Sequence, residues 1–281
     1  MSQGSAWERL VRGTGWIWLS ERYRAALPAN IAATVMTLRS SDRHHAKQGR
    51  STARVRFDTP HGTPLSVYLK RHERLPWITR VAAFLNPSGR HSPAGAEWAH
   101  LECVRALGIL VPEVVAVGEQ IGPWGRLRGF LMVEELAGCL ELNEALPDLK
   151  RSLDAQRFAA LKRELALEMA RIASTLHLAR VFHKDFYLCH FFLDMSEVDR
   201  LGCRLILIDF HRLGKHRLWG ARWRWKDLAQ LLYSTFGVEG IDDLDRLRFW
   251  KHYRRLTGQR FAKWQLRVVR FKAGRYFAHN H

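Results

Sequence analysis

Cysteine is scarce in this chain and follows no pattern. The four cysteines, Cys103, Cys139, Cys189 and Cys203, lie far apart and form no CxxC pair or His/Cys ladder. This argues against a structural zinc site and a disulfide framework, and it favours a reducing compartment. Long apolar runs are missing too: none approaches the ~20 residues of a membrane-spanning helix, and the first residues show no signal-peptide core. We therefore expect a cytoplasmic protein or one held peripherally on the inner face of the cytoplasmic membrane.

Acidic residues are also in deficit. The chain has 45 Lys+Arg against 27 Asp+Glu, a net charge of +18 over 281 residues. Such a surplus favours a polyanionic partner, which can be nucleic acid, an anionic membrane face or a phosphorylated glycolipid. A solvated basic surface is the alternative, and charge alone does not choose between them. The length suffices for one large domain or a bilobal one.

The first half of the chain alternates in the manner of strands. Residues 1–30 form a Trp-rich extension, which we expect to pack on the following domain, with a lipid headgroup boundary as the alternative. Beyond it, the pattern predicts an antiparallel lobe of five strands and one main helix. Its predicted strands span 34–38, 53–57, 65–69, 111–117 and 129–134, its main helix spans 96–107, and a short helix spans 78–85.

The second half has helical periodicity. Apolar residues at i, i+3 and i+4 predict helices over 140–149 and 154–179, and we expect His177 to be a packed or partly exposed histidine. The tail, 246–275, is dense in cations interleaved with aromatics. Three interpretations stay open for it: RNA binding by stacking, an anionic lipid interface, or a charged face over an aromatic core.

The most informative stretch runs from His183 to Arg212. Asp185 follows a predicted helix in the sequence HKDFYLCH, and a short strand over 204–208 ends on Asp209 in the sequence IDFHR. A helix, a turn with one acid, a hairpin and a second acid can bring two carboxylates together. One can accept a proton from an attacking hydroxyl, and the other can hold the magnesium that bridges nucleotide phosphates.

These two motifs resemble the catalytic loop and the metal-binding turn of the protein-kinase fold. His190 stands where protein kinases have asparagine, and His211 stands where they have the glycine after Asp-Phe. Both departures are similar to the lipopolysaccharide kinases, which phosphorylate heptose or Kdo sugars of the inner core. The resemblance implies a bilobal α+β fold, with a small antiparallel-sheet N-lobe over 31–136 and a mostly helical C-lobe over 137–281. It also implies ATP and Mg²⁺ as cofactors, with the nucleotide in the cleft.

The resemblance implies roles for the residues of the central motif. Asp185 would act as base or orienter for the sugar hydroxyl, and Lys184 would neutralise phosphate or brace the activation segment. Asp209 would be a metal ligand, and His190 would be a second ligand or a donor to a phosphate oxygen. His183 would support the loop structurally. Tyr187 occupies the place of a kinase lysine, so positive charge must come from elsewhere, with Lys184 and Arg212 as candidates.

Other roles fall outside the motif. Lys70, at a strand end, would pair with the nucleotide phosphates and with Glu97, for which Glu102 is the rival. Asp227 would brace the catalytic loop, with a helix-start acid as the alternative. The expected glycine-rich loop is replaced by residues 40–52, whose only glycine is Gly49; its donors would cover phosphates, or the segment is an ordinary hairpin tip. The predicted adenine-binding hinge comprises Met132, Glu134, Glu135 and Leu136.

The function implied by this resemblance is ATP-dependent phosphorylation of a lipopolysaccharide inner-core sugar. The partner would be a lipopolysaccharide-type glycolipid, at an anionic membrane surface, and nucleic acid is disfavoured. Two alternatives stay open. One is a protein or small-molecule kinase on the same fold, and the other is a non-catalytic RNA- or membrane-binding protein on a degenerate kinase scaffold.

Overall fold

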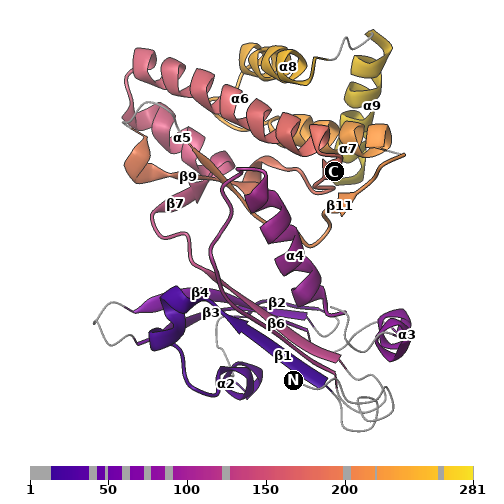
Figure 1. Ribbon diagram of the computed structural model, residues 1–281. Coiled ribbons are helices and arrows are strands. Elements are labelled where there is room, and N and C mark those ends of the chain that lie inside the picture. The colour runs from indigo at the N-terminus through magenta and orange to yellow at the C-terminus, as the bar shows by residue number, and fades with distance from the viewer. Residues whose placement is uncertain are drawn as a thin grey trace. The chain divides into compact units, whose positions relative to one another are not determined.

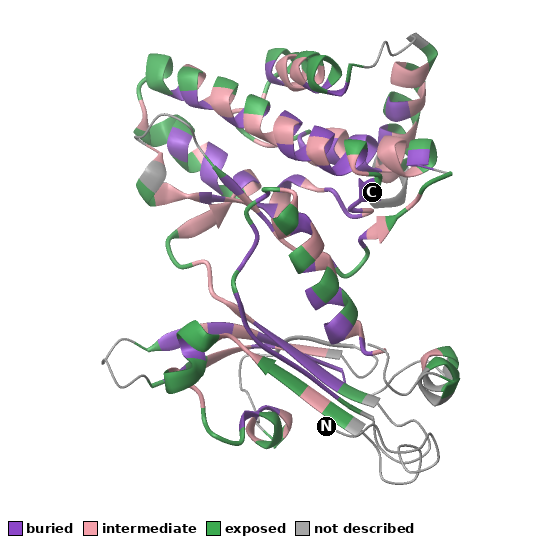
Figure 2. Ribbon diagram, viewed as in Figure 1, coloured by how far each residue is buried: buried purple, intermediate pink, exposed green. Residues whose placement is uncertain are grey.

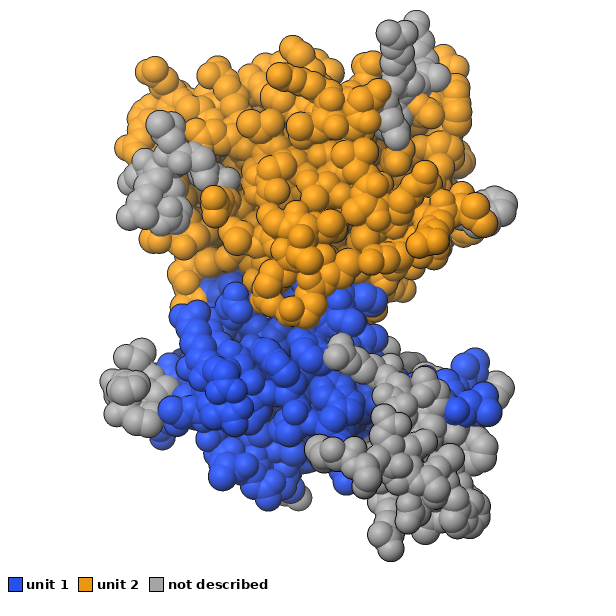
Figure 3. Space-filling view, in the orientation of Figure 1, with its two compact units in different colours: residues 1–101, 112–136 blue, residues 102–111, 137–281 orange. Residues whose placement is uncertain are grey.

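The computed structural model describes residues 14–37, 43–47, 50–58, 64–72, 77–85, 91–121, 127–198, 204–218, 220–258 and 263–280. The chain divides into two compact units (Figure 3). Unit 1 comprises residues 1–101 and 112–136, and unit 2 comprises residues 102–111 and 137–281. Two residues named in the sequence analysis, Gly49 and Cys203, lie outside the described residues.

Unit 1 is built on an antiparallel sheet with the strand order β1-β5-β6-β4-β3-β2 (Figure 1). In β1, Trp16 and Trp18 place their rings 5.6 Å and 5.3 Å from that of Trp98, as the packing interpretation of the Trp-rich segment expects. The elements are β1 (Thr14–Leu19), η1 (Glu21–Ala26), α2 (Ile31–Thr37), β2 (Arg43–Lys47), β3 (Arg50–Phe57), β4 (Leu65–His72), α3 (Trp77–Leu85), α4 (Pro93–Ala106), β5 (Val114–Ile121) and β6 (Leu127–Glu134).

Two predictions for this unit are wrong. The sheet has six strands among the described residues instead of five, because β1 pairs with β5 and β2 pairs with β3 in addition to four of the predicted strands. The segment 34–38 was expected to be a strand, but residues 31–37 form helix α2. Apolar residues in so short a run fit either period. Helix wins because Ile31 and Val35, one turn apart, are both buried in the sheet's hydrophobic cluster.

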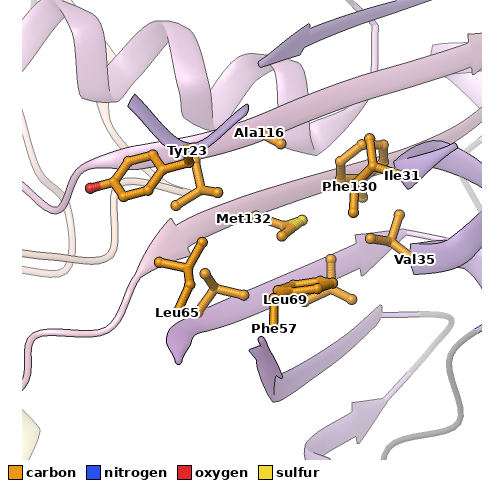
Figure 4. Close-up of a cluster of buried hydrophobic side chains, with 11 residues drawn as sticks. Tyr23, Ile31, Val35, Phe57, Leu65, Leu69, Ala116, Phe130 and Met132 are labelled. Carbon is orange, nitrogen blue, oxygen red and sulfur yellow. The ribbon is translucent and has the colours of Figure 1, made fainter. Parts of the chain in front are cut away.

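The hydrophobic core of unit 1 lies on one face of the sheet, where η1 and α2 cover it (Figure 4). Strand alternation decides which side chains enter this cluster. Leu69 of β4 and its partner Met132 of β6 point into it, whereas the next pair, Lys70 and Leu131, takes the other face. The cluster consists of Tyr23, Ile31, Val35, Phe57, Leu65, Val67, Leu69, Val115, Ala116, Phe130 and Met132.

Unit 2 is mostly helical, with two short sheets of the strand orders β10-β9-β7 and β11-β8 among its described residues. Helix α6 packs along α8, and α7 packs along α9. One face of α6 is buried and the other is exposed (Figure 2), as its apolar stripe predicts. The elements are β7 (Cys139–Glu141), α5 (Leu142–Ser152), α6 (Ala155–Leu178), β8 (Val181–Phe182), η3 (Leu188–His190), β9 (Phe191–Asp194), η4 (Met195–Glu197), β10 (Leu205–Leu207), β11 (Gly214–Lys215), α7 (Gly220–Ser234), α8 (Asp243–Thr257) and α9 (Lys263–Asn280).

Side-chain caps and one bridging lysine fix these helices. Asp154 accepts hydrogen bonds from the backbone amides of Gln156 and Arg157, so α6 begins at residue 155. Asp242 and Asp245 form a capping box at the start of α8. Lys162 of α6 lies 2.9 Å from Asp242 and 2.6 Å from Asp245, which ties α6 to α8. None of the helices in the described part of the chain combines the length and hydropathy that a bilayer crossing requires.

Candidate active site

The first acid of the motif, Asp185, lies in the loop between β8 and η3 and is nearly buried, at 8% exposure. Arg212 holds both of its carboxylate oxygens, with its Nη1 atom 3.0 Å from Oδ1 and 3.2 Å from Oδ2. Sequence reasoning mentioned Arg212 only as a source of positive charge. The structure makes it the direct cationic partner of Asp185.

Asp227 of α7 supports this loop from inside unit 2. Its side chain is fully buried and accepts hydrogen bonds from the backbone amides of His183, at 2.9 Å, and Lys184, at 2.8 Å. It also accepts from Nε2 of His177, at 3.3 Å, while Nδ1 of His177 lies 2.8 Å from the hydroxyl of Tyr253. Burial lowers the pKa of His177, so this histidine joins α6, α7 and α8 as a neutral ring.

Two more polar residues continue the same stripe of α7, at i+3 and i+7 from Asp227. Gln230 accepts from the Phe186 amide, at 3.2 Å, and its Nε2 atom lies 3.4 Å from Asp185 Oδ1. Ser234 accepts from the Leu188 amide, at 2.8 Å. Buried amides need such acceptors, so the stripe fixes the backbone on both sides of Asp185. The i+3 spacing in the sequence was a signal for Gln230 that the sequence analysis did not use.

The second acid, Asp209, ends the segment after β10 in a left-handed conformation, with φ +65°. Such a conformation is uncommon outside glycine and persists where neighbours hold it. Here two hydrogen bonds fix the preceding residue, Ile208. Ile208 donates its amide to the carbonyl of His190, at 3.0 Å, and accepts at its own carbonyl from His183 Nε2, also at 3.0 Å. Burial lowers the pKa of His183, which therefore acts as a neutral structural donor.

Two histidines connect the two acids. His190 Nδ1 lies 2.6 Å from the Asp185 carbonyl and must donate to it, which leaves Nε2 as the acceptor atom, 3.8 Å from Asp209 Oδ2. His211 Nδ1 lies 2.6 Å from Asp209 Oδ1, and its Nε2 atom lies 3.8 Å from Asp185 Oδ2. The two carboxylates predicted to converge are therefore neighbours within unit 2. The role of His211 as a link was missed, because the sequence analysis treated it only as a departure from a motif.

Lys184 takes a different direction from Asp185. Its Nζ atom lies over the ring of Trp223 of α7, 4.7 Å from the centroid, and its side chain fills the space beside Gly214 of β11. Lys226 donates a hydrogen bond to its carbonyl. These contacts place the Lys184 side chain between α7 and β11.

In unit 1, Lys70 Nζ lies 2.6 Å from Oε1 of Glu97, and Glu97 is buried. The ion pair implied for these two residues is therefore present. The rival, Glu102, pairs instead with Arg105 one turn along α4. Because Glu97 points from α4 to the sheet, the face of β4 that carries Lys70 is the face that α4 covers.

The nucleotide role of Met132 stays a prediction, and the structure places this side chain away from Lys70. Met132 lies in the hydrophobic cluster on the face opposite Lys70, while Leu131 pairs with Lys70 on the same face. Successive side chains of a strand point to opposite faces of the sheet, so residues 131 and 132 lie on different faces. In the hinge, Glu134 and Glu135 donate their backbone amides to the carbonyls of Glu113 and Ser66. Their side chains bind Tyr23 and Arg54, respectively.

Comparisons with known proteins place this geometry in context. Residues 68–253 match the lipopolysaccharide kinase (Kdo/WaaP) family. Lipopolysaccharide core heptose(I) kinase WaaP of Pseudomonas aeruginosa is 31% identical over 207 residues, 73% of this chain and 74% of that protein. The protein of the same name in Escherichia coli is 30% identical over 164 residues, 57% of this chain and 59% of that protein.

A solved structure is similar over most of its length. It is described as WaaP in complex with acyl carrier protein, with a TM-score of 0.69, 27% sequence identity, and coverage of 92% of this chain and 98% of that one. The bilobal, protein-kinase-like α+β fold predicted from the two motifs is thereby confirmed.

Proposed function

This chain belongs to the lipopolysaccharide kinase (Kdo/WaaP) family, and on that premise we propose that it phosphorylates a heptose of the lipopolysaccharide inner core. ATP-dependent phosphotransfer to an inner-core sugar follows from the family. The choice of heptose is supported by the relatives named heptose(I) kinase. The observation that carries the proposal is the pair of adjacent carboxylates, Asp185 and Asp209, linked by His190 and His211.

Asp185 is the proposed base. Arg212 and Gln230 leave its carboxylate oriented on a rigid loop, and a sugar hydroxyl brought to it would lose its proton there. Position 187 carries a tyrosine where protein kinases have a lysine, so another residue must supply positive charge, and Arg212 can do so. We assign to it the stabilisation of charge that develops on the transferred phosphoryl group.

Asp209 is the proposed magnesium ligand, and His190 is the proposed second group. Among the described residues, no set of three His, Cys, Asp or Glu side chains gathers as a metal site. This fits Mg²⁺, which kinases hold through one or two carboxylates with phosphate and water oxygens. The acceptor nitrogen of His190 faces an Asp209 oxygen at 3.8 Å, an arrangement that a cation or a donor would satisfy. When bound, magnesium would neutralise the phosphate oxygens.

Within unit 1, Lys70 is the proposed phosphate ligand, and Glu97 keeps its side chain extended. At the hinge, the amides of Glu134 and Glu135 already donate within the unit, so we propose the Leu136 amide as the donor to adenine. Leu131, on the face of Lys70, replaces Met132 as the side chain proposed beside the base.

Turnover on defined acceptors tests the proposal. Purified protein, labelled ATP and Mg²⁺ are incubated with a heptose-terminated core glycolipid, a Kdo-terminated core glycolipid and a generic protein substrate. We expect label only in the heptose acceptor, with loss of turnover in EDTA. Label in the Kdo acceptor alone would overturn the choice of sugar. Label in protein alone would favour the protein-kinase alternative.

A partner is proposed on separate grounds. The solved relative was obtained with acyl carrier protein, a partner that the sequence analysis did not expect. Unit 2 contains a cavity of about 470 Å³, and we infer that it accepts the acyl chain of such a carrier. Its lining is mainly apolar and comes from α5 to α9, with Leu146, Leu165, Leu231, Leu232, Phe249 and Leu266 among its residues.

Binding of loaded and unloaded carrier tests this partner. We expect the long-chain acyl form to bind at least tenfold more tightly than the unloaded form. Leu232→Trp, which adds bulk at the cavity wall, should remove that difference. Equal binding of both forms to the wild-type chain would contradict the assignment of the cavity.

A further inference from the structure

An unusual collection of cations surrounds one aromatic ring in unit 2, next to the catalytic loop. The Trp223 ring has Lys184 Nζ at 4.7 Å, the Arg222 guanidinium at 5.3 Å and Lys226 Nζ at 5.8 Å from its centroid. His216 stacks on the same ring at 5.2 Å. We call these five residues, Lys184, His216, Arg222, Trp223 and Lys226, the Trp223 cluster.

No carboxylate of the described residues lies within ion-pair distance of Lys184, Arg222 or Lys226. Arg212, by contrast, is paired with Asp185. Cation–π contact offsets part of the repulsion, but it supplies no countercharge. His216 adds a buried Nε2 atom without a hydrogen-bond partner. The cluster thus holds three cations with no carboxylate within ion-pair distance among the described residues.

The pKa values of the two lysines of the cluster are also shifted. Burial lowers the pKa of Lys184 against the charge of Asp227. Burial also lowers the pKa of Lys226, where the charges of Asp185 and Asp227 oppose the shift and those of Arg212 and Lys184 add to it. An oxyanion placed among these groups would reverse both effects, because it stabilises their protonated forms. Positive charge is therefore maintained there at a cost that an anionic ligand would offset.

The cluster is attached directly to the catalytic machinery. Lys184 immediately precedes Asp185, and Lys226 donates to the Lys184 carbonyl. The loop that carries His216 is anchored to the strand before the catalytic loop, because its amide donates to the Arg180 carbonyl at 3.1 Å and β11 pairs with β8. The ring of Trp223 thus contacts the residue that precedes Asp185, and the Trp223 cluster lies beside the loop that carries Asp185.

We propose that the Trp223 cluster is a binding site for a phosphate group of the glycolipid acceptor, distinct from the phosphates of ATP. This inference rests on the proposed function and names the feature of the acceptor that is read beside the reacting sugar. Arginine and lysine over an aromatic ring bind phosphate through charge-assisted hydrogen bonds.

The test compares acceptor glycolipid with and without its phosphate groups, presented in phosphatidylcholine vesicles in the absence of ATP. We expect the wild-type chain to bind the phosphorylated form about tenfold or more tightly, equivalent to about 1.4 kcal/mol. Arg222→Gln/Lys226→Gln should bring that ratio close to one. Lys226→Arg should largely retain it. The matched control is Lys251→Gln/Arg254→Gln, which removes one lysine and one arginine from exposed positions of α8 and should keep the ratio.

Three outcomes would overturn the proposal. They are an unchanged ratio in the Arg222/Lys226 variant, an equal loss in the α8 control, and an equal loss on phosphatidylglycerol vesicles that lack the acceptor. If the double variant unfolds, the single variant Arg222→Gln, at an exposed position, is tested in its place. Because binding is measured without turnover, a wild-type chain that binds the phosphorylated acceptor but transfers nothing would contradict the proposed function and leave the cluster standing.

Discussion

The two units hold their proposed catalytic groups in contrasting ways. In unit 1, Lys70 and Glu97 form one ion pair between a strand and a helix. In unit 2, Asp185 and Asp209 are held by arginine, glutamine and histidine side chains, and the surrounding backbone is fixed by a polar stripe of α7. A single pair can be replaced as a pair, whereas a network loses several hydrogen bonds when one member is removed. Stability and activity should therefore separate differently in the two units.

The largest expected effect is that of Asp185→Asn. The amide keeps the hydrogen bonds of Arg212 and Gln230 in part but cannot accept a proton, so kcat should fall about 10²–10⁴-fold. Steady-state kinetics with the glycolipid acceptor measure this, and the melting temperature should change little. Asp243→Asn, at an exposed acid of α8, is the control. Retention of most of the wild-type kcat would remove Asp185 from the proposed chemistry.

The network in unit 2 is challenged most directly by Asp227→Ala. The amides of His183 and Lys184 would lose their acceptor in a buried site, and His177 would lose its partner. We expect a loss of about 2–5 kcal/mol in the free energy of unfolding, since each unsatisfied buried group costs about 1–3 kcal/mol. Urea unfolding measures it. Asp227→Asn keeps one acceptor oxygen and should lose less, and the idea of a bracing network fails if the two variants are equally stable.

The single pair in unit 1 gives a smaller and separable effect. Lys70→Met leaves Glu97 buried without its partner and should lower kcat/KM for ATP about tenfold to a hundredfold, because a charged hydrogen bond contributes about 1.5–3 kcal/mol. Lys70→Met/Glu97→Leu should regain stability without regaining activity. Calorimetry and kinetics on the three proteins test this. Recovery of activity in the double variant would contradict the proposed phosphate contact of Lys70.

The smallest effect concerns the α6–α8 contact, away from the acids. The hydrogen bond from Lys162 is the main cause that lowers the pKa of Asp242 to about 2. A carboxyl whose folded-state pKa is lowered adds stability above its unfolded pKa, near 3.9, and loses it as the pH falls toward 2. Asn caps a helix about as well as Asp does, so Asp242→Asn loses mainly the partly exposed ion pair with Lys162 and should cost about 0.5 kcal/mol at neutral pH. This difference should shrink between about pH 4 and pH 2. Acid titrations of both proteins, followed by circular dichroism, measure it, and a pH-independent difference would contradict the assignment.

The sequence analysis succeeded where function is encoded in neighbouring residues. The HKD and IDFHR motifs predicted the family and the kinase activity, which are confirmed. The pattern also predicted most strands and helices of both units. It failed at residues 34–38, where a short apolar run fits two periods. The roles assigned to the individual site residues remain proposals.

By itself, the sequence determined the reaction class, because the two acids are read within motifs whose spacing is local. Only the tertiary structure decided which residues surround the two acids. Arg212 and Gln230 reach Asp185 from positions 27 and 45 residues away, and the Trp223 cluster gathers residues of three segments. Such contacts depend on how α7 packs against the catalytic loop, and packing is set by the whole core of a unit rather than by any local pattern.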